Sequence, residues 1–153
     1  MLFDRAIHSV VNGFHEAIPQ SVKRAIKRVS PGIVDTFYRQ LTRLTSDRPI
    51  EVQVQSGPLH GRRLMCSLRH QRSCYLGNFE PYKAELLAQY LAPGQVFFDV
   101  GGHIGYFSLI AAGCVRPTGL VVAFEPSPQN VEQFKQNMQL NSDLLPFLAL
   151  EET

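Results

Sequence analysis

The chain has 153 residues, of which 44% are hydrophobic, and a formal net charge of +2. This length and composition suffice for one compact core, and so small a net charge gives no reason to expect a nucleic-acid partner. The sequence has no run of roughly 18 to 20 apolar residues that could span a bilayer, and polar residues interrupt the N-terminal stretch where a secretory signal would lie. We therefore expect a cytoplasmic protein without a transmembrane segment.

Residues 1–46 are predicted to form a helical segment. From Leu2 to Val29, apolar residues recur every three or four positions, which is the period of an amphipathic helix, and Pro19 divides this stretch in two. A further short helix is expected over residues 33–44. The second half of the long stretch carries a basic cluster: Lys23, Arg24, Lys27 and Arg28. Two interpretations of this cluster stay open, a solvated face or a surface that contacts anionic lipid or another acidic partner.

The cysteines indicate neither a disulfide framework nor a metal site. Cys66, Cys74 and Cys114 are odd in number, and none lies in a Cys-x-x-Cys pair. We expect three free thiols.

Residues 47–74 are predicted to form a β-hairpin that leads into the rest of the chain. Residues 50–55 alternate apolar with polar side chains, and residues 64–68 partly resume this pattern after two turn signals. Residues 75–80 have the composition of a turn. Residues 81–91 have the spacing of a helix, which Pro93 and Gly94 close.

From Gly94 onward, short apolar strands alternate with helices. Residues 96–100 and 120–124 are apolar runs typical of parallel strands that are covered on both faces. Helices are expected over residues 106–112 and 128–140. This order, with its short connections, predicts an α/β fold with right-handed parallel crossovers.

Within this alternation, Ser127 is expected to cap the second helix, and Phe107 and Phe134 are expected in the core. A third strand is expected within residues 144–150, where Pro146 indicates an edge position or a turn before the strand.

The turn at residues 101–105 has the composition of a nucleoside-binding loop. Glycines let the backbone approach a ligand closely, and the N–H groups of the following helix attract a carboxylate or a phosphate. Glu125 comes directly after the second apolar strand, where an acidic side chain can accept hydrogen bonds from both hydroxyls of a ribose.

The glycine spacing discriminates between nucleosides. A dinucleotide fingerprint would need glycines at positions 101, 103 and 106, but His103 and Tyr106 stand at two of these. The methyltransferase pattern has an acidic residue at the strand end, followed by glycines two, four and six residues later. Asp99, Gly101 and Gly105 satisfy it, and His103 replaces the middle glycine. A dehydrogenase-like nucleotide binder is therefore disfavoured.

Three stretches, residues 99–108, 123–128 and 137–141, resemble the FkbM family of S-adenosylmethionine-dependent methyltransferases. Residues 77–80 and 91–94 resemble the family's lead-in, so the resemblance spans residues 75–141. Members of the family commonly have alanine where Gly102 stands and asparagine where His103 stands. Histidine, like asparagine, is enriched at positive φ, so this departure is mild.

The resemblance implies a Rossmann-like class I methyltransferase fold, of which residues 75–153 would hold only the first β-α-β-α units. It also implies S-adenosylmethionine as the cofactor, with the loop along its methionine part, Asp99 orienting the loop or meeting the ammonium group, and Glu125 holding the ribose. The residues it assigns to the cofactor pocket are Glu80, Asp99, Gly101, Gly102, His103, Ile104, Gly105, Glu125, Pro126 and Ser127.

Alternatives stay open at three of these positions. Asp99 could cap local backbone donors, and Glu125 could be an exposed charge at a helix entry. His103 has a pKa range suited to a general base, but loop geometry explains it more simply. No catalytic residue is assigned.

The function implied is methyl transfer from S-adenosylmethionine to a hydroxyl oxygen of a small molecule or sugar, with the acceptor unknown. Because this class of enzyme has a seven-stranded sheet, we expect the chain to be a fragment of a longer protein. The alternative is a non-catalytic fragment or subunit that binds ligand weakly or pairs with a partner chain at the open edge of its sheet.

Overall fold

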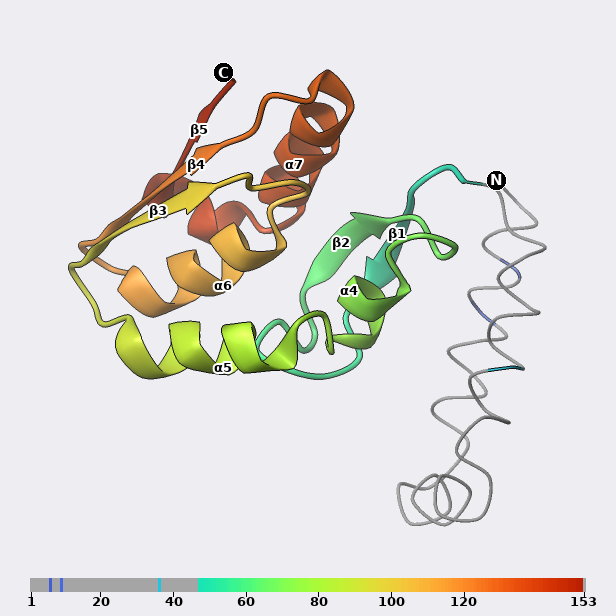
Figure 1. The fold of residues 1–153 in the computed structure, drawn as a ribbon, viewed down its shortest axis with the longest axis horizontal. Coiled ribbons are helices and arrows are strands. Elements are labelled where there is room, and N and C mark those ends of the chain that lie inside the picture. Colours follow the sequence, from blue (N-terminus) through green and yellow to red (C-terminus); the bar gives the residue numbers. More distant parts are fainter. Residues whose placement is uncertain (1–5, 7–8, 10–35, 37–46, 153) are drawn as a thin grey trace, which may run out of the picture. The chain divides into compact units, whose positions relative to one another are not determined.

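The computed structural model describes residues 6, 9, 36 and 47–152 (Figure 1). The predicted helices of residues 1–46 and their basic cluster lie outside this described part, apart from those three isolated positions. The described residues divide into two compact units. One contains residues 47–50 and 67–72, and the other contains residues 51–66 and 73–152.

The predicted hairpin is present as a two-stranded sheet of β1 (Ile50–Gln53) and β2 (Arg63–Cys66). Its connection is closed by Val54, whose N–H donates to the Arg62 carbonyl (2.9 Å) and whose carbonyl accepts from the Gly61 N–H (2.9 Å). The alternation predicted from the sequence therefore corresponds to a real strand pair.

Two helices follow the hairpin. The short helix α4 (Arg72–Leu76) was not predicted, and it includes Tyr75 and Leu76, which were expected in a turn. Five residues are too few to show a helical period, which explains the error. The next helix, α5 (Pro81–Tyr90), has Pro81 in its first turn, where a missing N–H costs no hydrogen bond.

The remainder is a parallel sheet in the order β3-β4-β5 with two intervening helices. Its elements are β3 (Val96–Val100), α6 (Tyr106–Val115), β4 (Leu120–Phe124), α7 (Pro128–Leu140) and β5 (Leu148–Glu151). The 3₁₀ helix η1 (Ser142–Phe147) contains Pro146 and precedes β5, so the expected turn before the third strand is confirmed.

The expectation that both faces of these strands are covered is wrong for β3. Val96, Phe98 and Val100 are 55%, 61% and 83% exposed, whereas Phe97 and Asp99 on the opposite face are half-buried. Helix α6 contacts β3 and β4, and β3 lies at the edge of the sheet. An apolar run cannot show by itself whether both of its faces find a partner, and here one face of β3 lies open.

Helix α6 supplies much of the core of this unit. It is apolar around most of its circumference, and its buried side chains are Tyr106, Ser108, Leu109, Ile110, Ala111, Ala112 and Val115. Phe134 of α7 is fully buried, as predicted. Phe107, also predicted to be core, is only half-buried and faces a cavity instead.

Candidate functional site

The loop of residues 101–105 follows the carboxyl end of β3 and is fastened to the end of β4. The N–H groups of Gly101 and Gly102 both donate to the Phe124 carbonyl, each at 2.9 Å. The Gly105 N–H donates to the Gly102 carbonyl at 2.8 Å. Because parallel strands end at the same edge of a sheet, this loop lies beside the residues that follow β4.

The loop needs left-handed backbone conformations at three positions. The φ angles are 85° at Gly101, 51° at His103 and 83° at Gly105. His103 thus adopts the left-handed conformation that was expected for a residue replacing the middle glycine of the pattern. A Cβ atom on Gly105 would lie 2.4 Å from the Phe134 ring, so this glycine also provides space for the packing of α7.

Glu125 is buried and fastens the loop. It is only 5% exposed, so the alternative of an exposed charge at a helix entry is wrong. One carboxylate oxygen accepts from the His103 N–H (2.8 Å), and the other accepts from the Ser127 N–H (3.0 Å) and Asn130 Nδ2 (2.9 Å). Ser127 occupies the N-cap position as expected, but its hydroxyl makes no capping hydrogen bond.

These hydrogen bonds give Glu125 a pKa below its usual range. Burial by itself raises the pKa, but the donors from Asn130, Ser127 and His103 outweigh it. Glu125 is therefore held as a charged carboxylate at neutral pH, joining the end of β4 to the loop.

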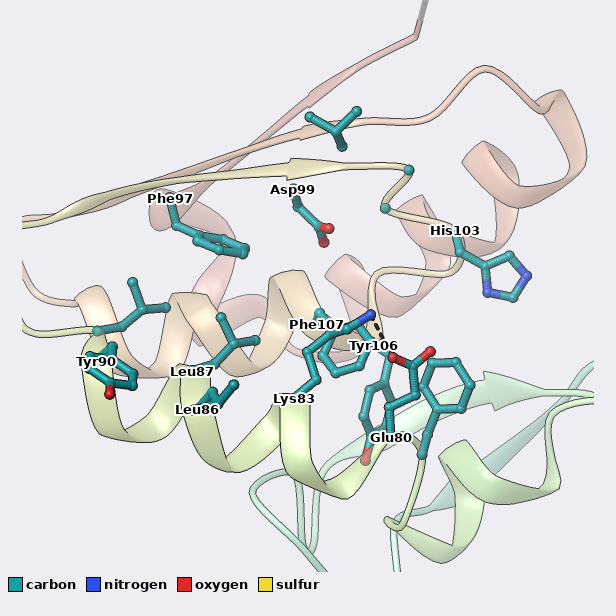
Figure 2. A pocket seen from close by; sticks show the side chains of 15 residues that line it. Glu80, Lys83, Leu86, Leu87, Tyr90, Phe97, Asp99, His103, Tyr106 and Phe107 are labelled. Atoms are coloured by element: carbon teal, nitrogen blue, oxygen red, sulfur yellow. Dashed lines mark ion pairs between the residues drawn. The ribbon is translucent and has the colours of Figure 1, made fainter.

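Asp99 points from β3 into a cavity (Figure 2). Its carboxylate accepts a short hydrogen bond from the Ser108 hydroxyl of α6. This partner is a side chain of the following helix, so the bond orients the carboxylate, whereas the alternative of backbone capping finds no support among the described contacts.

The cavity has a volume of about 570 Å³, which is within the range of small-molecule sites. Its lining combines apolar side chains from α5, β3 and α6 with the carboxylates of Asp99 and Glu80 and the ammonium of Lys83. The apolar part consists of Phe79, Leu86, Leu87, Tyr90, Leu91, Phe97, Val100, Tyr106 and Phe107. Such a site suits a ligand that combines apolar surface with charged groups.

Five of the ten residues predicted for the cofactor pocket line this cavity, namely Glu80, Asp99, Gly101, Gly102 and His103. The other five do not line it. Ile104 and Gly105 are buried, Ser127 is half-buried and Pro126 is exposed, while Glu125 acts on the loop as described. The His103 ring is exposed and points away from Asp99 (Figure 2).

Four backbone N–H groups of the loop are used within the chain, and the expectation that the following helix offers free N–H groups to a ligand stays a prediction. The N–H groups of Gly101, Gly102, His103 and Gly105 donate within the chain. These four donors stabilise the shape of the loop, and the polar side chains that reach the cavity come from the strand and from α5.

Sequence reasoning missed a set of amide side chains on α7 that supports the loop. Asn137 is fully buried; its Oδ1 accepts from the Met65 N–H of β2 (2.6 Å), and its Nδ2 donates to the Ile104 carbonyl (2.8 Å). Gln133 donates to the Met65 carbonyl (2.7 Å). One residue therefore joins the hairpin directly to the loop.

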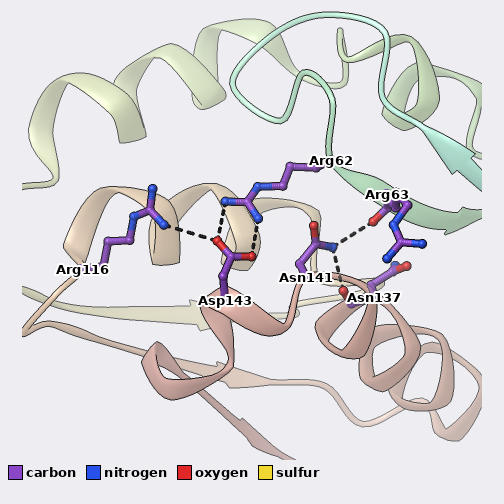
Figure 3. Close-up of polar contacts among 6 residues, drawn as sticks. All are labelled: Arg62, Arg63, Arg116, Asn137, Asn141 and Asp143. Atoms are coloured by element: carbon purple, nitrogen blue, oxygen red, sulfur yellow. Dashed lines mark hydrogen bonds and ion pairs between the residues drawn. The ribbon is translucent and has the colours of Figure 1, made fainter.

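The same attachment continues toward the end of α7 (Figure 3). Asn141 Nδ2 donates to the carbonyls of Arg63 and Asn137, both at 2.8 Å. The spacing of four between Gln133, Asn137 and Asn141 was the available signal, since it places three amides on one face of the helix.

An ion-pair cluster lies beside these amides (Figure 3). Asp143 of η1 accepts from both terminal nitrogens of Arg62 (2.5 and 2.9 Å) and from Arg116 (3.3 Å). The Arg62 guanidinium holds the pKa of Asp143 below its usual range. The cluster connects the hairpin turn to the end of α6 and to η1.

Within the described part of the chain, no group of three or more His, Cys, Asp or Glu side chains could hold a metal ion. Cys66, Cys74 and Cys114 are free thiols, and burial raises the pKa of each of them. No helix among the described residues is long and apolar enough to cross a membrane.

No family model and no curated protein matches the sequence. Among solved structures, the chain is similar to TYW2 of Pyrococcus horikoshii in complex with MeSAdo, with a TM-score of 0.51 and 15% identity over 78% of this chain and 49% of that one. It is also similar to a protein from the same organism described as a transferase, with a TM-score of 0.51 and 18% identity over 71% of this chain and 37% of that one.

A third solved structure, the precorrin-6y C5,15-methyltransferase of Geobacter metallireducens GS-15, has a TM-score of 0.41 and 20% identity over 48% of this chain and 38% of that one. The chain thus spans 37% to 49% of the lengths of these proteins. The fold of the chain is therefore a Rossmann-like α/β unit with a parallel sheet, similar to part of the first two of these structures.

Proposed function

We propose that the chain binds S-adenosylmethionine as the cofactor-binding part of a methyltransferase. One observation carries the proposal: the Asp99 carboxylate faces a cavity of about 570 Å³ at the end of β3, where the loop with left-handed Gly101 and Gly105 begins. S-Adenosylmethionine has an ammonium and a sulfonium group besides its carboxylate, ribose and adenine, and the carboxylates of Asp99 and Glu80 suit its two cationic groups.

Glu125 is proposed to take part in holding the ribose. A carboxylate has about four acceptor sites, and three donors already bind to Glu125. One site remains for a ribose hydroxyl while the loop stays fastened. This differs from the expectation of bonds to both hydroxyls, which would require Asn130 or a backbone N–H to leave.

The bound cofactor would supply an electrophilic methyl group. The contribution of this chain is to hold the cofactor in one orientation, because in such transfers much of the rate comes from placing donor and acceptor in line. We propose a hydroxyl oxygen of a small molecule or sugar as the acceptor, on the resemblance of residues 99–108 and 123–128 to the FkbM family. Glycine at 102 suits this loop, since a Cβ there would lie 2.9 Å from the Phe134 ring.

Calorimetric titration with S-adenosylhomocysteine tests the proposal. We expect the protein to bind this ligand and not NADH, because the glycine spacing fails for a dinucleotide. Asp99→Asn should weaken binding by about 10-fold or more, as expected for loss of a charged partner. Asp143→Asn is the matched control, since Asp143 lies in the ion-pair cluster and does not line the cavity. The proposal would be refuted if the folded protein bound neither S-adenosylmethionine nor S-adenosylhomocysteine.

A second candidate is a non-catalytic unit that binds ligand and pairs with a partner chain. The open face of β3 favours it, because Val96, Phe98 and Val100 form an exposed apolar row. The two candidates differ in a single-turnover assay with labelled S-adenosylmethionine. Methyl transfer by the chain alone would refute the non-catalytic candidate.

A further inference from the structure

Lys83 has a position that the proposed function leaves unexplained. Among the described residues that line the cavity, it is the only lysine or arginine. Its ammonium lies 2.5 Å from the Glu80 carboxylate and 4.8 Å from the centre of the Phe107 ring. Figure 2 shows the side chain rising from the first turn of α5 between these two residues, on the side of the cavity toward which Asp99 points.

The charges of the cavity form a pattern when Lys83 is included. The lining presents two carboxylates, Asp99 and Glu80, and one ammonium, Lys83. S-Adenosylmethionine presents the opposite set, with one carboxylate, one ammonium and one sulfonium. Opposite charges attract at short range, so this match would contribute to binding.

We propose that Lys83 binds the carboxylate of the ligand's amino acid tail, while Glu80 and Asp99 face its cationic groups. This inference rests on the proposed function and adds to it the residue that recognises the tail. A lysine ammonium has three donors, and the Glu80 carboxylate occupies one in the described contacts. Lys83 can therefore bind a second carboxylate without leaving Glu80.

A simple surface ion pair is the competing explanation, and the chain contains a matched example. Lys135 lies 2.5 Å from the Glu152 carboxylate, and its side chain is 47% exposed, compared with 56% for Lys83. Lys135 does not line the cavity. Exposed pairs of this kind contribute little to stability, so replacing either lysine should leave the fold intact.

The experiment compares two ligands that differ in the tail. Dissociation constants for S-adenosylhomocysteine and for 5′-methylthioadenosine, a thioether nucleoside without the amino acid tail, are measured for the wild type, Lys83→Met and Lys135→Met. We expect Lys83→Met to weaken S-adenosylhomocysteine about 10- to 100-fold, as for loss of a charge-assisted hydrogen bond, and to leave methylthioadenosine unchanged. Lys135→Met should change neither.

The outcomes separate the inference from the proposed function. A wild type that binds neither ligand overturns the proposed function and the inference with it. If the wild type binds both ligands equally well, or if Lys83→Met weakens both by the same factor or neither, the inference alone is overturned. Thermal unfolding of the three proteins confirms that each is folded when its affinity is measured.

Discussion

At the scale of single residues, the loop depends on how closely Gly105 approaches Phe134. Gly101 and Gly105 have nearly the same φ, 85° and 83°, but only Gly105 is crowded: a Cβ there would lie 2.4 Å from the Phe134 ring, whereas nothing lies within 4 Å of a Cβ on Gly101. The two glycines therefore separate the cost of backbone strain from the cost of lost space.

Alanine substitutions at these two positions test the distinction. Gly101→Ala should lower the free energy of unfolding by about 1 to 2 kcal/mol through backbone strain. Gly105→Ala should lower it by about 1 to 3 kcal/mol more, because overpacking adds to the strain. Urea denaturation of both variants measures the difference. Equal losses would show that the Phe134 ring moves aside without cost.

Glu125 makes the stability of the folded protein depend on pH. Its pKa in the folded protein lies below the ordinary value of 4.5, since hydrogen bonds from Asn130, Ser127 and His103 outweigh the effect of burial. A lowered folded pKa contributes stability that is complete above the unfolded pKa and is lost as the pH falls through the folded pKa. This contribution should therefore disappear in the acid range, below pH 4.5.

Glu125→Gln measures the contribution. At about pH 7 the variant should be less stable than the wild type by about 1.5 to 3 kcal/mol, the range for hydrogen bonds to a charged group. The difference should shrink toward zero as the pH falls through the acid range, because the wild-type carboxyl then also becomes neutral. Urea denaturation across the pH series shows this convergence, and a difference independent of pH contradicts it.

Those residues of the candidate site that lie together along the chain could be predicted from the sequence. The residues that meet only in the fold could not. Asp99, the loop glycines and His103 stand in one continuous motif, so their spacing carries the information. Lys83 lines the cavity and Asn137 supports the loop only through what they face across the fold. No local pattern shows that a lysine on α5 reaches a cavity below β3.

At the scale of elements, α7 does more than cover the sheet. Its buried residue Phe134 was predicted from the sequence, but the amides of Gln133, Asn137 and Asn141 attach it to the backbone of β2. Because Asn137 also binds the Ile104 carbonyl, the hairpin, the helix and the loop form one connected structure.

Removal of the Asn137 side chain should show this connection. Asn137→Ala leaves the Met65 N–H and the Ile104 carbonyl without their partner, at a cost of about 1 to 3 kcal/mol for each group that stays unpaired. Hydrogen exchange at residues 101–105 should also become faster. Gln136→Ala is the control on the same helix, since Gln136 bonds only to Glu132 in the described contacts and should change stability by less than about 0.5 kcal/mol. If hydrogen exchange at residues 101–105 were unchanged in Asn137→Ala, Asn137 would not couple the hairpin to the loop.

Among the helices and strands, those without a clear period could not be predicted from the sequence. Helices and strands with a clear period were predicted from the sequence. The turn that was expected at Pro146, before the third strand, is present as η1. Helix α4 has two adjacent buried residues, Cys74 and Tyr75, in only five positions, so its sequence has no period to detect.

At the scale of the whole molecule, the sheet has one covered and one open face. The apolar content of β3 predicted burial on both faces, and the structure corrects this because α6 lies against one of them. Phe98 and Phe124 stack with ring centres 6.4 Å apart, which makes the exposed row part of a continuous apolar patch. Patches of this kind favour association.

Replacing Phe98 should therefore reduce self-association of the chain. Phe98→Thr is expected to lower light scattering and dye binding at a given protein concentration, since threonine keeps strand propensity while it removes the ring. Tyr82→Thr is the control, because Tyr82 is 74% exposed but lies on α5, away from the sheet face. Equal effects of both substitutions would mean that the patch has no special role.

The central claim is that the cavity beneath Asp99 and the loop of residues 101–105 binds S-adenosylmethionine. Amide chemical-shift mapping during titration with S-adenosylhomocysteine tests it most directly, because it reports both binding and place. We expect saturable shifts at Asp99, in residues 101–105 and in the first turns of α5, with little change around Asp143. Saturable shifts confined to other surfaces, or none at high ligand concentration, would contradict it.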